Sequence, residues 1–198
     1  QHILDLGKYA AIPVINGLTD FNHPCQVMSD IFTVLEHRGH LNDLKVVFVG
    51  DGNNVAHSWF KLAQRIPMEL IIACPEGFEP DENVVKETQE TGLSSVSVSY
   101  DSYSAAAGAD VIYTDVWASM GQEEEAAERK KIFEPFQVNT ELMTVAGDQA
   151  YFMHCLPAHR GDEVTDEVID GSQSIVFDEA ENRMHVQKAI MVYLMGAV

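Results

Sequence analysis

The sequence predicts an α/β protein with a doubly wound parallel sheet, and three observations lead to this fold class. Short apolar runs, rich in β-branched residues, recur along the chain. They are continuous rather than alternating, which is typical of strands that are covered on both faces. Stretches with helical character lie between them, and strands that alternate with helices form right-handed βαβ units.

The expected elements follow the chain in a regular order. We expect strands at residues 44–50, 69–75, 95–100, 110–115, 150–157 and 174–179. We expect helices at residues 54–66, 81–91, 102–108, 122–133, 137–146, 163–169 and 180–196. Parallel sheets of this kind bind ligands in the crevice at the carboxyl ends of their strands. The residues that follow each strand are therefore the candidates for a functional site.

The front of the chain has a different character. Its first 17 residues indicate a helix that runs into a short strand, and a polar loop and a helix from 24 to 37 follow. We interpret residues 1–37 as the tail of a preceding α/β domain with a connecting helix. Residues 38–180 then form a complete α/β domain, and residues 181–198 form a C-terminal helix. Because the chain lacks an initiating Met and starts within a helix, we expect it to belong to a longer protein.

Composition excludes several classes of protein. The net charge is −19, with 31 acidic against 12 basic residues, and nucleic-acid binding needs a basic stripe that this chain lacks. We also expect no membrane association, because no apolar run approaches the ~18 residues of a membrane-spanning helix. The three widely spaced cysteines favour a reducing compartment over a disulfide framework. We therefore expect a protein that is not secreted.

The stretch GDGNN, residues 50–54, follows the first strand and only partly matches a dinucleotide-binding loop. Val55 stands where the third glycine of that fingerprint is required. The next strand ends in Cys74 and a proline, where a nicotinamide enzyme places an acid for the ribose. Both departures argue against a nicotinamide cofactor. Asn53 and Asn54 either cap the helix that starts here or hold a substrate carboxylate at its N-terminus.

The stretch TDVWASMGQEEE, residues 114–125, follows the fourth strand. Asp115 ends the strand, Ser119 and Met120 follow it, and Gly121 offers a hinge. An acid at a strand end beside a serine and a glycine suits a cationic amine. An ordinary loop between a strand and a helix is the alternative.

The fifth strand ends in His154 and Cys155, which a Leu-Pro pair follows. A zinc site needs three or four ligands, and neighbouring residues of a strand point to opposite faces. A nucleophilic cysteine needs a base and an orienting group, which the sequence alone does not show. A purely structural pair is the remaining alternative.

Two further stretches carry polar candidates. His23 and Gln26 lie three residues apart around Pro24, which suits the first turn of a helix. They either cap that helix or present neutral donors to a carbonyl or carboxamide from one face. Arg183 lies near the start of the last expected helix, where it either pairs with a local acid or reaches a ligand.

Together, five stretches resemble the ornithine transcarbamylase family in their order and spacing, from about residue 5 to the C-terminus. They are INGLTDFNHPCQ, GDGNN, TDVWASMGQEEE, HCLP and FDEAENR. The resemblance implies a Rossmann-like ornithine-binding domain. It also implies carbamoyl transfer from carbamoyl phosphate to the δ-amine of L-ornithine, giving L-citrulline and phosphate in arginine biosynthesis or the urea cycle. No metal or other cofactor is implied.

The resemblance also assigns roles to residues. It implies that His23, Gln26 and Arg183 contact carbamoyl phosphate, and that Cys155 and Leu156 line the site between the two substrates. The residues implied to bind L-ornithine are Leu18, Asn54, Asp115, Ser119 and Met120. Of all these, His23, Asp115, Cys155 and Arg183 are the expected catalytic residues. Either Asp115 or Cys155 takes the proton that the ornithine amine must lose.

One family feature is missing from this sequence. No Ser-Thr-Arg-Thr run, the family's phosphate-binding loop, occurs in the chain. We therefore expect the chain alone to be inactive and the full-length protein to be a homotrimer, as is typical of the family. The alternative is a non-catalytic module, derived from the same family, that binds ornithine or a protein partner.

Overall fold

The computed structural model describes residues 2–118 and 125–196, and a sheet of five parallel strands forms the centre of this described part. The strands are β1 (Lys45–Val49), β2 (Glu69–Ala73), β3 (Ser95–Ser99), β4 (Val111–Thr114) and β5 (Tyr151–His154). Their order, β3-β2-β1-β4-β5, confirms the predicted doubly wound sheet. The winding reverses between β1 and β4, so a crevice is expected at the carboxyl ends of these two strands.

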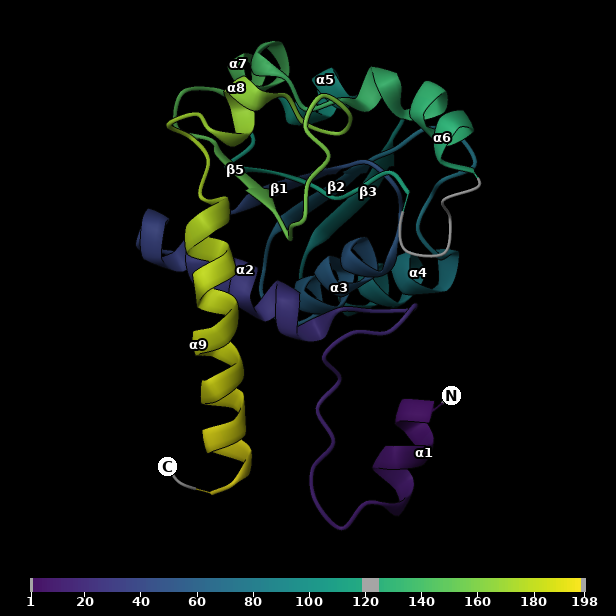
Figure 1. The fold of residues 1–198 in the computed structure, drawn as a ribbon, viewed down its shortest axis with the longest axis vertical. Helices are drawn as coiled ribbons and strands as arrows, with labels where there is room; N and C mark the ends of the chain where they lie inside the picture. Colours follow the sequence, from purple (N-terminus) through teal and green to yellow (C-terminus); the bar gives the residue numbers. More distant parts are fainter. Residues whose placement is uncertain (1, 119–124, 197–198) are drawn as a thin grey trace.

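Helices cover both faces of the sheet (Figure 1). On one face lie α2 (Pro24–Arg38), α3 (Asn54–Ala63) and α4 (Glu82–Thr91). On the other lie α5 (Ser102–Ala106), α7 (Thr140–Ala146) and α8 (Asp166–Ile169), with α6 (Ala126–Phe133) and a short 3₁₀ turn (Glu134–Phe136) beside them. Within the described residues, none of the helices combines the length and the apolar character that crossing a membrane requires.

Alternate residues of the strands divide the core into two layers. Phe48 and Tyr113 stack with their ring centroids 5.5 Å apart and pack under Trp59 of α3. Val49 and Phe152 point to the opposite layer, where α5, α7 and α8 cover them. All five of these side chains are fully buried. This burial on both faces explains why the strand sequences are continuously apolar.

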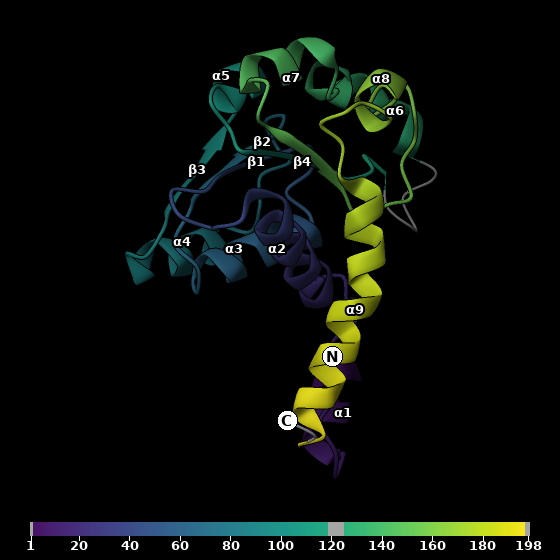
Figure 2. The same cartoon turned by 90° about the vertical axis from the view of Figure 1, so that its left-hand side faces the viewer.

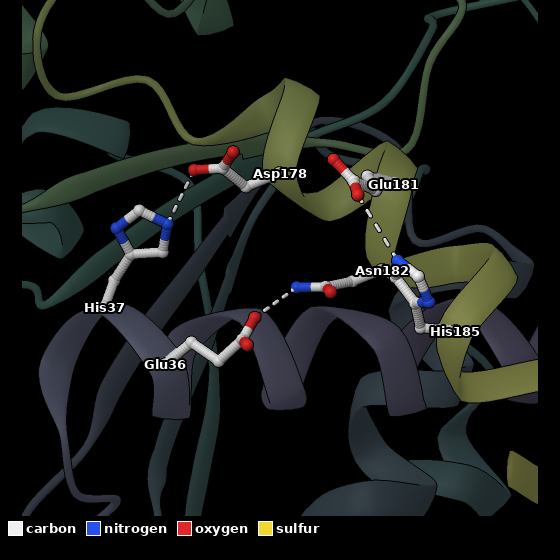
Figure 3. A pocket seen from close by; sticks show the side chains of 6 residues that line it. All are labelled: Glu36, His37, Asp178, Glu181, Asn182 and His185. Atoms are coloured by element: carbon white, nitrogen blue, oxygen red, sulfur yellow. Dashed lines mark hydrogen bonds and ion pairs between the residues drawn. The ribbon is translucent and has the colours of Figure 1, made fainter.

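The long helix α9 (Val176–Leu194) packs against α2 and extends beyond the body of the domain (Figures 1 and 2). Inside the seam, the amide of Asn182 donates to Thr33 Oγ1 over 3.0 Å and to Glu36 Oε2 over 2.6 Å. On the outer side, His37 pairs with Asp178 at 2.8 Å (Figure 3). These contacts fix α9 relative to α2, although the two helices are far apart in the sequence.

Two of the expected strands are wrong. Residues 174–179 form no strand: Ser174 makes a single bridge to Phe152, and α9 begins at Val176. A short apolar run does not distinguish a strand from a buried helical turn, and the acids of this run suit the start of a helix. Arg183 consequently lies inside α9 rather than near its start. The short strand expected before residue 17 is also absent, because residues 12–19 form neither helix nor strand.

Candidate active site

Asp115, immediately after β4, is the centre of a cluster at the point where the winding reverses. Its side chain is 9% exposed. Its Oδ2 accepts a hydrogen bond of 2.7 Å from Asn53 Nδ2, at the start of α3 after β1. Its Oδ1 accepts from the backbone N–H of Val116 at 2.8 Å and from the Cys155 thiol, after β5, at 3.1 Å. Donors from the ends of three strands therefore surround one carboxylate.

The thiol of Cys155 is a donor in this arrangement. Burial raises the pKa of Cys155 well above its usual value, and the neighbouring charge of Asp115 raises it further. A thiol with a raised pKa stays protonated at neutral pH, so it is neither a ready nucleophile nor a base. Cys155 is therefore the less suitable of the two groups left open as proton acceptors.

This arrangement predicts slow alkylation of Cys155. Iodoacetamide reacts with the thiolate, so the Cys155 rate should increase with pH, and Asp115→Asn should accelerate it about tenfold at neutral pH by removing the adjacent charge. Mass spectrometry of digested protein measures this rate. Cys25 and Cys74, which are buried elsewhere, serve as internal controls. An unchanged Cys155 rate in the variant would show that Asp115 does not hold the thiol in its protonated form.

His23, Gln26 and Arg183 form a second cluster between α2 and α9. Arg183 Nη1 donates to Gln26 Oε1 over 2.7 Å and lies 3.4 Å from His23 Nε2. Its Nη2 donates to the carbonyl of Gly17 at 3.3 Å. The backbone N–H of His23 in turn donates to Ser58 Oγ at 2.6 Å, which ties the start of α2 to α3. The three side chains that the sequence proposed for one ligand are therefore in direct contact.

His23 is neutral in this cluster. Burial lowers its pKa, and the positive charge of Arg183 lowers it further, to about 4. Arg183 can only donate hydrogen bonds, so Nε2 of His23 is the acceptor and Nδ1 carries the hydrogen. A neutral imidazole beside a guanidinium provides polar contacts without a second positive charge.

The Asp115 cluster and the His23–Gln26–Arg183 cluster interact electrostatically and are connected through the fold. The charge of Asp115 acts on His23 and partly opposes the lowering of the pKa of this histidine. Tyr113, two residues before Asp115, donates from its hydroxyl to Glu179 Oε1 at 3.1 Å. Glu179 Oε1 also accepts a hydrogen bond of 2.9 Å from Gln26 Nε2. A continuous set of hydrogen bonds thus runs from β4 to the second cluster.

The remaining predicted site residues lie in different places. Asn54 donates from Nδ2 to the carbonyl of Thr19 at 2.8 Å. Leu18, which precedes Thr19 in the chain, is 52% exposed. Leu156 has a left-handed backbone with φ of 55°, which is unusual for a residue other than glycine, and precedes a cis proline. The positions of Ser119 and Met120 fall outside the described residues.

A metal site at this cluster does not fit the donors that are present. One ligand atom each of Asp115, His154 and Cys155 lie within 4.8 Å of one another. Both ring nitrogens of His154 are already bonded, since Nδ1 accepts from the N–H of Leu156 at 2.9 Å and Nε2 lies 3.3 Å from Glu163 Oε1. Without His154, two ligands remain, fewer than a zinc site uses. His154 instead supports the backbone at the end of β5.

Sequence reasoning missed three residues of these clusters and left open the role of a fourth, Asn53. Asn53, and not its neighbour Asn54, contacts Asp115, although the sequence places both amides at the start of the helix. Tyr113 and Glu179 form the connection between the clusters, and Asp30 joins them through Gln26. The position of Asp30 beside Gln26 could have been predicted, since it lies four residues after Gln26 and hence on the same face of α2.

Comparison with known proteins identifies the class to which this fold and site belong. The profile of the aspartate/ornithine carbamoyltransferase Asp/Orn-binding domain matches residues 42–194, and that of the carbamoyl-P-binding domain matches residues 1–36. The chain belongs to the aspartate/ornithine carbamoyltransferase family. The resemblance inferred from the five sequence stretches is thereby confirmed.

Individual relatives indicate the branch of the family. The chain is 57% identical over 196 residues to the chloroplastic ornithine carbamoyltransferase of Pisum sativum, covering 99% of this chain and 52% of that protein. It is 55% identical to the ornithine carbamoyltransferase of Thermococcus kodakarensis, covering 100% of this chain and 64% of the relative. The solved structure of ornithine carbamoyltransferase from Pyrococcus furiosus superposes with a TM-score of 0.93 at 54% identity, over 99% of this chain and 64% of that one. The chain thus spans between half and two thirds of the length of these relatives.

Proposed function

We propose that this chain provides the ornithine-binding part, and some of the carbamoyl-phosphate contacts, of an ornithine carbamoyltransferase. The observation that carries the proposal is the pairing of two clusters of opposite character. Asp115 offers a carboxylate suited to an amine, and Arg183, held against His23 and Gln26, offers donors suited to a carbamoyl group. The ends of the strands and the seam between α2 and α9 bring both to one region.

The proposed reaction follows from these two halves. The δ-amine of L-ornithine attacks the carbamoyl carbon, a C–N bond forms, and the bond from carbon to the phosphate oxygen breaks. L-Citrulline and phosphate leave, and the amine loses a proton. The positive charge of Arg183 stabilises the oxygen that becomes negative in the tetrahedral intermediate. Binding both substrates in one cleft brings the reacting atoms together. Leu18, Asn54 and Leu156 are proposed to complete the contacts with substrate, together with Ser119 and Met120 of the adjoining loop.

The amine attacks only when it is neutral, and its ordinary pKa is about that of lysine, ~10. Asp115 is the proposed acceptor, because the raised pKa of Cys155 keeps that group protonated. The thiol then acts as a donor that stabilises the Asp115 carboxylate and lines the space between the substrates. This assignment chooses between the two alternatives that the sequence left open.

The proposal divides the chain as the sequence suggests. Residues 1–37 are the end of a carbamoyl-phosphate-binding domain with its connecting helix, and residues 38–180 are the ornithine-binding domain. The C-terminal helix expected at residues 181–198 corresponds to the outer part of α9, which begins at Val176 and ends at Leu194. The missing phosphate-binding loop has to come from residues outside this chain. We propose a homotrimer for the full-length protein, a step in arginine biosynthesis or the urea cycle, and a cytoplasmic or organelle location.

A citrulline assay combined with a binding measurement tests this proposal. The 198-residue chain should bind L-ornithine in calorimetry but should form no citrulline from ornithine and carbamoyl phosphate. A chimera with the preceding segment of the Pyrococcus furiosus relative should form citrulline. The matched control is the same chimera carrying Asp115→Asn, which should be severely impaired.

Other outcomes would contradict specific parts of the proposal. Turnover by the isolated chain near that of a full-length enzyme would show that no outside residues are needed for phosphate binding. Binding of ornithine by full-length protein that forms no citrulline would support the alternative of a non-catalytic module.

A further inference from the structure

Two fully buried carboxyl groups, Asp30 of α2 and Glu179 of α9, lie directly behind the carbamoyl side of the proposed site. Gln26 Nε2 donates to both of them, over 2.8 Å to Asp30 Oδ1 and over 2.9 Å to Glu179 Oε1. Both acids are 0% exposed. No lysine or arginine of the described residues pairs with either of them. Two unpaired buried charges in contact would be very unfavourable, so the pair must hold a proton.

The hydrogen bonds indicate which of the two acids carries this proton. Glu179 accepts from three donors: Gln26, the Tyr113 hydroxyl, and the backbone N–H of His154 at 3.1 Å. Asp30 Oδ1 accepts from Gln26, and the Tyr113 hydroxyl, which is shared with Glu179, also acts on Asp30, but the buried Oδ2 of Asp30 accepts from no described donor. Burial and the charge of Glu179 raise the pKa of Asp30 well above its usual value. Burial also raises the pKa of Glu179, but the hydrogen bonds from Asp30, His154 and Tyr113 oppose this rise. The negative charge therefore lies on Glu179, and the proton lies on Asp30.

This distribution has a consequence for Gln26. The pair takes both amide hydrogens of Gln26, which leaves Oε1 as the only atom of the amide that can face Arg183. The flipped amide would place Oε1 against the two acids and turn an NH₂ group toward the guanidinium, which also can only donate. We propose that the singly protonated Asp30–Glu179 pair is a positioning unit that locks the Gln26 amide with its oxygen toward the carbamoyl group.

The positioning role rests on the proposed function and makes the two acids behave differently on substitution. Asp30→Asn preserves the pattern, because its amide nitrogen replaces the O–H donor toward Glu179 and its oxygen accepts from Gln26. Glu179→Gln breaks it, because one amide oxygen cannot accept from three donors and its NH₂ group then meets another donor. Gln26 must turn in the second variant and should remain in place in the first.

The test uses full-length protein with carbamoyl phosphate and L-ornithine as substrates. Glu179→Gln should reduce kcat/KM for carbamoyl phosphate about ten- to hundredfold, the cost of a misdirected hydrogen bond to a charged group. Asp30→Asn should stay within about threefold of wild type, and KM for ornithine should change little in both variants. In infrared spectra at neutral pH, wild type should show the C=O stretch of a protonated carboxylic acid that Asp30→Asn lacks.

Equal kinetic losses in both variants, or no protonated-carboxyl band that disappears with Asp30→Asn, would overturn the inference. The infrared measurement needs no turnover, so it decides the protonation of the pair even if the proposed activity fails. If Glu179→Gln does not fold, the near-normal kinetics of Asp30→Asn and its missing band still support the inference, and a large loss in Asp30→Asn contradicts it.

Discussion

Replacing Arg183 with lysine in the full-length protein is expected to reduce kcat/KM for carbamoyl phosphate by about 10²- to 10³-fold. The guanidinium uses two nitrogens, one between Gln26 and His23 and one toward the carbonyl of Gly17. A lysine ammonium is a single point and cannot span these partners, although it keeps the charge. KM for L-ornithine should change much less, because Asp115 is untouched. Steady-state kinetics with each substrate varied in turn measures both effects.

Arg160→Lys is the matched control for this prediction. Arg160 pairs with Asp166 at 2.8 Å and Asp170 at 2.5 Å on an exposed surface, and such ion pairs contribute only about 0–1 kcal/mol. The control should therefore retain both activity and stability. If Arg183→Lys behaved like Arg160→Lys, the planar fork of Arg183 would have no part in binding carbamoyl phosphate.

Asp115→Asn is expected to reduce kcat/KM for L-ornithine by a comparable factor, about 10²- to 10³-fold, while KM for carbamoyl phosphate stays nearly constant. The substitution removes both the charge that is proposed to attract the amine and the group that is proposed to take its proton. Its new NH₂ group also meets either the amide of Asn53 or the thiol of Cys155 and the N–H of Val116. A donor facing a donor costs about 1–3 kcal/mol, so the urea midpoint should also decrease.

Asp101→Asn is a control of the same chemistry at an exposed position. Asp101 caps α5 by accepting from the N–H of Ser104 at 3.0 Å, and asparagine caps helices equally well. This variant should keep wild-type kinetics. Equal losses for both substrates in Asp115→Asn would show that Asp115 acts through the fold rather than through the amine.

The sheet was predictable because its strands are buried on both faces. Runs such as residues 44–50 are continuously apolar, and the structure has strands there to within one or two residues. The run at 174–179 is also apolar at residues 175–177 but starts α9, because Val176 belongs to the packed core and the acids Asp178 and Glu179 suit a helix N-terminus. Periodicity over so few residues cannot separate the two outcomes.

The site was predictable where a residue is placed by its element alone. Asp115 and Cys155 follow parallel strands that lie side by side, so their convergence follows from the fold. The choice between Asn53 and Asn54 depends on which amide the start of α3 turns toward β4, which a sequence does not show. The role of Glu179 could not be predicted from the sequence for another reason. Its partners Gln26 and Tyr113 are 153 and 66 residues away and contact it only through tertiary packing.

The hydrogen bonds that the Asp115 carboxylate already accepts affect which ligands can bind beside it. Asn53, Val116 and Cys155 occupy three of the about four acceptor sites of this carboxylate, so a ligand competes with donors that are already in place. A neutral donor would gain little from replacing a thiol, whereas an ammonium group gains a charge-assisted bond about twice as strong. We therefore expect an amine that binds as an ammonium ion to compete with the existing hydrogen bonds of Asp115 more effectively than a neutral analogue of the same shape.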